Sequence, residues 1–346
     1  MNRNRQLGLA SFLTVLAAIL ASFAIAVALI FVFSKNPGQT LYYYFLGPFL
    51  SRYALFNMLE SSVPLMFTGL GIALAFNSGV TNLGGEGQIF SGALVAVVVG
   101  IAVPAAPRAL GVLAILAGGT LAGGLLAGFS GVLRRRWNVS ELLTTYLLSS
   151  GVVYVINYLI LGPLRNPQKM TIESVSIPAW FMLARLAPPS FLHSGLLLAL
   201  AAAGAVYFLV YRTHLGYELR ASGSNRQFAR YGGINVGQYF VLPLLLSGGL
   251  TGLGGAVQVV GRYQSCFTDL TAGLGWNGIA VALIARNNPL AVVPAALLYA
   301  YLSAGAKAAM INSDVTFELA AIIQAVIFYL ITAEAAMAFF RRRLNG

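Results

Sequence analysis

The sequence predicts an all-α fold, a polytopic transmembrane helical bundle, from three observations. Of the 346 residues, 58% are hydrophobic and only 9% are charged. The mean hydropathy is +0.81, and a soluble fold could not bury so much apolar surface. The chain also divides into a series of apolar runs near the length, roughly 20 residues, that a membrane-crossing helix needs. We therefore expect a single integral membrane domain over residues 1–346.

The apolar runs follow one another with short connections. In order they cover residues 7–33, 53–75, 89–103, 109–133, 142–161, 191–211, 239–260, 290–311 and 317–340. The run 89–103 has a possible earlier start near Gly85. The first run is long for a signal peptide and has no convincing cleavage site before Lys35, so we interpret it as a retained span. A shorter piece, 276–285, lies between glycine-rich and Asn-Asn-Pro borders and is a candidate tenth crossing.

The placement of arginine decides the number of crossings. Arg3 and Arg5 precede the first run, and Arg341, Arg342 and Arg343 follow the last. Basic residues favour the cytoplasmic side, so both termini should be cytoplasmic and the number of crossings even. Counting residues 276–285 as a crossing also places the basic clusters at 134–136 and 212–238 inside. The prediction is about ten crossings. The basic residues then stand at span ends, which argues against a nucleic-acid surface despite the net charge of +12.

Glycine patterns predict how the spans pack. The spacing of Gly119, Gly123, Gly124 and Gly128 allows a neighbouring helix to approach closely. The sequence Thr-Gly-Leu-Gly occurs at residues 68–71 and again at 251–254, each time before a polar break and another apolar run. In the ten-crossing topology the two copies run in opposite directions. They predict an inverted internal repeat, with chance recurrence as the alternative.

A polar stretch, residues 76–88 (FNSGVTNLGGEGQ), separates two strongly apolar runs. In lipid, backbone that leaves a helix must be buried in protein or line a watery cavity. The stretch is therefore either a short cytoplasmic turn or part of a transport pathway. We predict the latter, with residues 263–277 as its partner from the second half of the chain. The candidate pathway residues are Asn77, Asn82, Glu86, Gln88, Trp276 and Asn277.

Charged residues inside spans are functional candidates because they are costly there. Four glutamates fall in or near spans, namely Glu60, Glu86, Glu318 and Glu334. Glu86 has the strongest case, since polar residues surround it, whereas Glu60 and Glu318 could pair with a buried donor. No motif predicts catalysis, and no lysine follows a glycine, so a Walker A loop is impossible. Cys266 is the one cysteine, and His193 and His214 flank a single span, so no metal site or cofactor is predicted.

The loop 212–238 holds a short amphipathic segment, residues 225–231. Phe228 and Tyr231 are three residues apart and share a helix face, and Arg226 and Arg230 flank them. An exposed aromatic side chain on a cytoplasmic helix is suited to docking in a groove of a partner protein. The alternative is an interfacial helix resting on anionic lipid.

Three ordered blocks resemble a known family. LAFNSGVTNLGGEGQIFSGA resembles the FNxG…N-(I/L)-G-x-EGQ signature of ATP-binding cassette (ABC) importer permeases in the branched-chain amino acid and ribose permease superfamily. Within it, the nucleoside and simple-sugar branch is the most similar. ELRASGSNRQFARYGGINV resembles the family's R-A-x-G-x-N-x-x-x-A-R-Y-x-G-I-N loop, and LTAGLGWNGIAVALIARNNPL resembles its third block. The resemblance extends from about Leu55 to the C-terminus, although residues 77–78 and 80–81 are more polar than the pattern.

The resemblance implies a permease subunit of an ABC importer in a bacterial cell (inner) membrane. Its partners would be two cytoplasmic ATP-binding subunits, a second permease chain of the same or sister sequence, and an external solute-binding lipoprotein. The solute would be a nucleoside or a simple sugar. The family loop implies a set of ATPase-coupling residues: Arg220, Gly223, Asn225, Phe228, Ala229, Arg230, Tyr231 and Gly233. A different class remains open: a stand-alone secondary transporter or channel that uses Glu86 as its proton or cation site.

Overall fold

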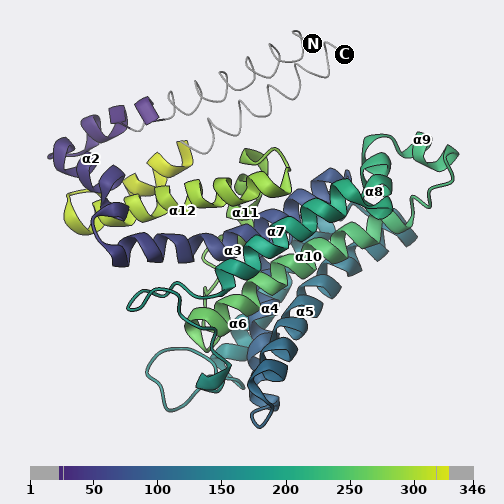
Figure 1. Cartoon of the computed structure of the whole chain (residues 1–346), viewed down its shortest axis with the longest axis horizontal. Helices are drawn as coiled ribbons and strands as arrows, with labels where there is room; N and C mark the ends of the chain where they lie inside the picture. Colours follow the sequence, from purple (N-terminus) through teal and green to yellow (C-terminus); the bar gives the residue numbers. More distant parts are fainter. Residues whose placement is uncertain (1–22, 26, 317, 327–346) are drawn as a thin grey trace. The chain divides into compact units, whose positions relative to one another are not determined.

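The computed structural model describes residues 23–25, 27–316 and 318–326. Within them the fold is helical apart from isolated β-bridges, as predicted (Figure 1). The helices are α2 (Pro37–Leu46), α3 (Arg52–Asn77), α4 (Gly85–Ala102), α5 (Arg108–Trp137), α6 (Glu141–Leu161), α7 (Gly195–Arg212), α8 (His214–Ser224), α9 (Arg226–Tyr231), α10 (Gln238–Gln258), α11 (Leu274–Ile284) and α12 (Pro289–Asn312). A π-helical turn, η3 (Val259–Tyr263), extends α10.

Seven helices in the described part of the chain are long and apolar enough to cross a membrane: α3, α4, α5, α6, α7, α10 with η3, and α12. Helix α11 is apolar but has only 11 residues. The predicted first and last spans, 7–33 and 317–340, lie largely outside the described residues. The number ten therefore stays a prediction.

The two polar stretches predicted as breaks, residues 76–88 and 263–277, contain fewer irregular residues than the sequence predicted. Helix α4 already begins at Gly85, so only residues 78–84 of the first break are irregular. Helix α11 begins at Leu274, which places Trp276 and Asn277 on a helix. In both cases the first helical turn includes glycine, and at α4 it also includes Glu86, whose negative charge is favourable at a helix N-terminus. Some of the polar residues in these two stretches therefore belong to the first turns of helices, and the others form the irregular segments.

The chain divides into two compact units. The first combines the described parts of Met1–Met58 and Leu297–Gly346. In it, Asp314 accepts hydrogen bonds from the Ser34 hydroxyl at 2.7 Å and the Lys35 backbone N–H at 2.5 Å. The second unit, Leu59–Ala296, holds α4 to α11 and all of the candidate site residues.

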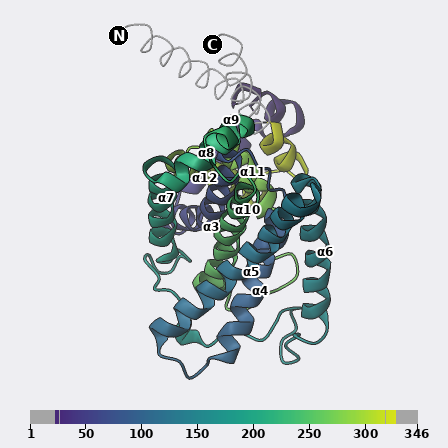
Figure 2. The same cartoon turned by 90° about the vertical axis from the view of Figure 1, so that its right-hand side faces the viewer.

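Helices α4, α5 and α10 form the centre of the second unit and run side by side (Figure 2). The predicted glycine pattern is what brings them together. A Cβ on Gly123 would overlap the backbone of Gly248 and Gly252 on α10, and one on Gly119 would overlap Ala256. The backbones of α5 and α10 are therefore in direct contact.

The two Thr-Gly-Leu-Gly copies also pack against each other. A Cβ on Gly71 of α3 would lie 2.9 Å from the Thr251 hydroxyl, and one on Gly254 of α10 would lie 2.9 Å from the Cβ of Phe67. The last glycine of the first copy thus contacts the first residue of the second, and the last glycine of the second contacts the residue just before the first. Reciprocal contact of this kind is what an inverted repeat would produce, and the repeat itself stays a prediction.

Helices α8 and α9 lie at one end of the second unit, and the long segment 162–194 lies at the opposite end (Figure 1). That segment is fastened to the end of α10 by backbone hydrogen bonds: Leu183 N–H to Val260 O (2.7 Å), Ile177 N–H to Gln264 O (2.8 Å) and Ser174 N–H to Cys266 O (2.8 Å). The unit therefore has two distinct ends on which different partners could act.

Candidate functional site

A pair of buried amides closes the first break. The side-chain amide of Asn82 donates to Gln88 Oε1 at 2.9 Å and to the Ser247 hydroxyl at 2.8 Å. Gln88 Nε2 donates back to Asn82 Oδ1 at 2.8 Å, and the Gly84 backbone N–H donates to the same oxygen at 2.9 Å. Asn82 and Gln88 are buried. In this conformation both amides are buried and use their hydrogen bonds to hold the irregular backbone.

Glu86 joins the two breaks. Its Oε1 accepts a hydrogen bond from the Gly273 backbone N–H at 3.0 Å, and its Oε2 accepts one from Gly275 at 2.8 Å. These N–H groups are at the N-terminus of α11, where a carboxylate satisfies unpaired donors and the helix dipole. Gly85 and Gly275 touch at the same point, since a Cβ on Gly85 would lie 2.9 Å from the Gly275 Cα.

The contact between the first break and the start of α11 forms a junction, to which helix α6 contributes two hydroxyls. The Thr145 hydroxyl accepts a hydrogen bond from the Leu83 N–H at 3.1 Å, and the Ser149 hydroxyl accepts one from the Gly87 N–H at 2.7 Å. Thr145 and Ser149 are four residues apart and share a helix face. Sequence reasoning missed both. Their signal was a buried polar pair at helical spacing within an apolar span.

An exposed aromatic pair lies beside the junction. The rings of Tyr146 on α6 and Trp276 on α11 are 6.0 Å apart, centroid to centroid. Tyr146 is 43% exposed and Trp276 is 47% exposed. Trp276 was predicted as a pathway residue, whereas Tyr146 was not, because its neighbour across the junction is set only by the packing of α6 on α11.

Asn77 lies apart from the other pathway candidates. Its side-chain amide donates to the backbone oxygens of Ala73 at 2.9 Å and Asn287 at 2.6 Å. Asn287 follows the C-terminal end of α11, whereas Glu86 binds the N-terminal end. Eleven helical residues separate the two ends by about 16 Å. Asn77 therefore holds the end of α3 against the turn after α11, while Glu86, Trp276 and Asn277 gather at the start of α11.

The predicted ATPase-coupling segment forms two short helices. Asn225 caps α9, its Oδ1 accepting the Phe228 N–H at 3.0 Å. Phe228 is 68% exposed and Tyr231 is 92% exposed, while Ala229 is buried. Arg220 is turned back, with its guanidinium over the Tyr211 ring at 5.1 Å. Gly233 has φ +82°, which only glycine adopts readily, so it sets the turn after α9. The surface of this segment is thus made by Phe228, Arg230 and Tyr231.

The start of α9 is attached to the first break. Arg226 donates from Nη2 to the Gly79 backbone oxygen at 3.1 Å. Its guanidinium also lies over the Phe240 ring at 4.6 Å, and that of Arg134 lies over the same ring at 5.5 Å. Gly223, at the end of α8, touches the backbone of Ser78 and Gly79. The segment and the break are therefore in direct contact.

The other predicted carboxylates have separate roles. Glu60 is buried and forms an ion pair with Arg262 of η3, whose side chain is 29% exposed, so Glu60 has a donor but that donor is not buried. Glu318 is exposed. Glu334 lies outside the described residues.

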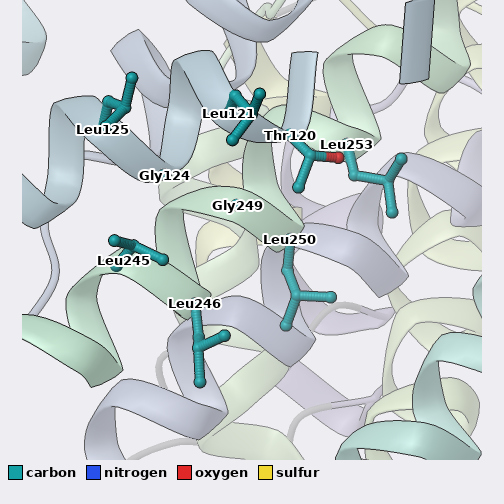
Figure 3. Close-up of a pocket in the computed structure, with 9 residues that line it drawn as sticks. All are labelled: Thr120, Leu121, Gly124, Leu125, Leu245, Leu246, Gly249, Leu250 and Leu253. Carbon is teal, nitrogen blue, oxygen red and sulfur yellow. The ribbon is translucent and has the colours of Figure 1, made fainter. Parts of the chain in front are cut away.

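An apolar cavity of about 230 Å³ lies between α5 and α10 (Figure 3). It is lined by leucines and glycines together with Thr120, whose hydroxyl is already donated to the Leu116 oxygen at 2.8 Å. A polar solute would find no available hydrogen-bonding group among these lining residues. Since burying polar groups without partners is costly, this cavity does not suit such a solute.

Comparison with known proteins gives a consistent family. The model of the family described as "Branched-chain amino acid transport system / permease component" matches residues 54–332. A glucose ABC transporter permease protein of Haloferax volcanii is 34% identical, covering 96% of this chain and 88% of the relative. A guanosine ABC transporter permease protein of Bacillus subtilis is 32% identical, covering 86% of each. A nucleoside ABC transporter permease protein of Lactococcus lactis is 28% identical, covering 92% of this chain and 90% of the relative.

The family match includes all three blocks on which the resemblance was based, and it extends over every described helix from α4 to α12. Two relatives exceed 30% identity over most of their length. The chain is therefore a multi-pass membrane protein that belongs to the branched-chain amino acid transport system permease-component family.

Proposed function

We propose that this chain is the permease subunit of an ABC importer and that its solute is a nucleoside. The observation that carries the proposal is the direct contact between α8–α9 and the first break, through Gly223, Arg226 and Gly79. It connects the exposed aromatic surface that suits a cytoplasmic partner to the junction at Glu86. A movement of α8 would therefore reach the break through backbone contact at Gly223, and a movement of α9 would reach it through the Arg226 side chain.

Each partner has a place in this proposal. Two cytoplasmic ATP-binding subunits would dock on the surface formed by Phe228, Arg230 and Tyr231 and supply the ATP hydrolysis that this family does not perform. A second permease chain, of the same or sister sequence, would complete the path. An external lipoprotein would deliver the solute at the end that carries residues 162–194. Ten crossings, with both termini in the cytoplasm, agree with this arrangement.

The choice of nucleoside is supported by relatives and by the site. Two of the three relatives above are named as guanosine or nucleoside permeases, and the third as a glucose permease. The exposed Tyr146–Trp276 pair offers two aromatic rings, tilted by 59° to each other, beside polar groups. A simple sugar is the second candidate, because the Haloferax relative is named for glucose.

The geometry of Glu86 argues against a stand-alone proton or cation transporter. Both carboxylate oxygens accept backbone N–H groups, which suits a structural carboxylate that holds the two breaks together. A coupling site would instead need to exchange its proton or ion during each cycle.

The proposal is tested by reconstituting the chain in liposomes with the ATPase and lipoprotein encoded beside it. Uptake of a radiolabelled nucleoside should require ATP and should persist when the proton gradient is collapsed. Glucose and ribose serve as competing solutes in the same vesicles. Uptake that continued without ATP and stopped with the gradient would contradict the importer assignment, and uptake of sugar alone would contradict the choice of solute.

A further inference from the structure

The surface of α6 next to the junction combines aromatic and polar groups in one line. Tyr146, Ser150 and Asn157 are separated by four and seven residues, so they lie on one face of the helix. Asn157 Oδ1 is buried, and within the part of the chain that the structure describes it has no hydrogen-bond partner. An unpaired buried acceptor is costly, which makes Asn157 a candidate for a hydrogen bond that forms in another conformation of the protein.

The aromatic pair stands at one end of this line. Trp276 on α11 meets Tyr146 at a centroid distance of 6.0 Å, and about half of each side chain remains exposed. The backbone at both rings is anchored to the first break, because Thr145 precedes Tyr146 and Gly275 precedes Trp276, and both bind that break. The rings are therefore fixed at the surface of the junction while their faces remain accessible.

The carboxylate of Glu86 at the junction already has hydrogen-bond partners within the chain. Glu86, the carboxylate nearest to Trp276 along the contact, uses both oxygens on backbone N–H groups. A ligand at the aromatic pair would meet ring faces and neutral hydrogen-bonding groups such as Ser150 and Asn277, which are partly exposed. This combination fits a neutral solute with a flat ring and polar edges.

We propose that Tyr146 and Trp276 contact the solute's base during passage, one ring stacking on its face and the other, inclined by 59°, meeting its edge, and that they contribute to its selection. The inference rests on the proposed function and specifies its solute-contacting surface. Stacking on an aromatic side chain tolerates any base, because every base has a π-face, so the pair would favour nucleosides as a class. The face of α6 that leads on to Asn157 would then supply hydrogen bonds to the polar edges of the solute.

Substitution separates stacking from a structural role. In the complete importer with a saturating nucleoside-loaded lipoprotein, Tyr146→Leu and Trp276→Leu should each lower the uptake rate at least fivefold. Tyr146→Phe keeps the ring and should transport like the unsubstituted protein. Tyr158→Leu is the matched control. Tyr158 is exposed on the same helix, but it lies about three turns further along and on a face rotated by about a third of a turn from Tyr146.

Photolabelling provides a measurement that does not depend on the variants. An azido-nucleoside bound to the unsubstituted importer should label the peptide that contains Tyr146 or Trp276. If nucleoside uptake is normal but Tyr146→Leu behaves like Tyr158→Leu, or the label is found only elsewhere, the stacking surface is wrong while the importer assignment stands. If the unsubstituted importer carries sugar alone, both the stacking surface and the choice of nucleoside are overturned.

Discussion

Gly79 and Gly223 are in backbone contact, and a Cβ placed on Gly79 would lie 2.7 Å from the Gly223 Cα. Gly79 belongs to the turn that ends α3, and Gly223 belongs to the last turn of α8. Gly79 also has φ +65°, which favours glycine, and its oxygen accepts the hydrogen bond from Arg226. Because a contact between two backbones transmits displacement more rigidly than one between two long side chains, this contact is suited to connect the α8–α9 segment to the break.

Enlarging Gly223 should disturb that contact. A methyl group there would lie 2.5 Å from the Ser78 carbonyl carbon, so Gly223→Ala must separate α8 from the break. We expect ATP-dependent uptake to fall about tenfold while the ATPase subunits still bind and hydrolyse ATP. Gly204→Ala on α7, where a Cβ would have no neighbour within 4 Å, is the control and should leave uptake unchanged. Equal uptake by both variants would exclude transmission through Gly223.

The exposed aromatic of α9 should bind the ATPase. Phe228→Ala and Arg230→Glu alter side chains that face outward, so the melting temperature of the permease should change by no more than about 1–2 °C. Both variants should fail to co-purify with the ATPase and should lose uptake. Gln227→Ala, at the exposed position just before Phe228, is the control. Normal co-purification and uptake by the Phe228 and Arg230 variants would leave the segment without a coupling role.

Glu86 should be replaceable by glutamine but not by leucine. Glutamine retains one acceptor oxygen for the α11 N–H groups, whereas leucine leaves both without a partner, at a cost of roughly 1–3 kcal/mol for each unsatisfied group. Glu86→Gln should keep substantial ATP-dependent uptake, and Glu86→Leu should abolish assembly or transport. Vesicle uptake with and without a proton gradient distinguishes the two roles. Equal loss in both variants would favour a titrating site.

The topology predicted from the arginines can be measured at the two termini. Cysteines introduced at Asn2 and Gly346 should both react only with reagents that reach the cytoplasmic face. The native Cys266 is buried and should give little background labelling. Labelling of the two positions from opposite faces would require an odd number of crossings.

The segment 162–194 should become less stable in acid because of Glu173. Burial alone would raise the pKa of this carboxyl, but hydrogen bonds from Ser265, Thr171 and Lys169 outweigh burial and lower the pKa below its ordinary value of 4.5. A lowered folded-state pKa stabilises the fold above pH 4.5, and the contribution disappears as the pH falls through the folded-state value. Glu173→Gln should remove this part of the pH dependence in thermal unfolding measured in detergent. An unchanged pH profile would show that Glu173 does not stabilise the segment.

The spans could be predicted from sequence because their signal is local. Apolar length alone predicts α3, α5, α6, α10 and α12 to within about four residues, since lipid requires a continuous hydrogen-bonded helix. The close approach of α5 and α10 was predictable for a similar reason, because glycine at four-residue spacing exposes backbone on one face. The importance of residues 76–88 followed from polar residues standing where lipid tolerates few of them.

Which residues meet across the breaks was decided only by the tertiary structure. Glu86 was recognisable in sequence as a carboxylate needing donors, but those donors are the N–H groups of Gly273 and Gly275, almost two hundred residues later. Every residue except proline carries the same backbone N–H group, so the sequence does not show which of these groups will bind Glu86. Tyr146 became a site residue only because α6 packs beside α11. The sequence thus determined the spans and the polar breaks, whose causes are local, while packing between distant segments determined their partners.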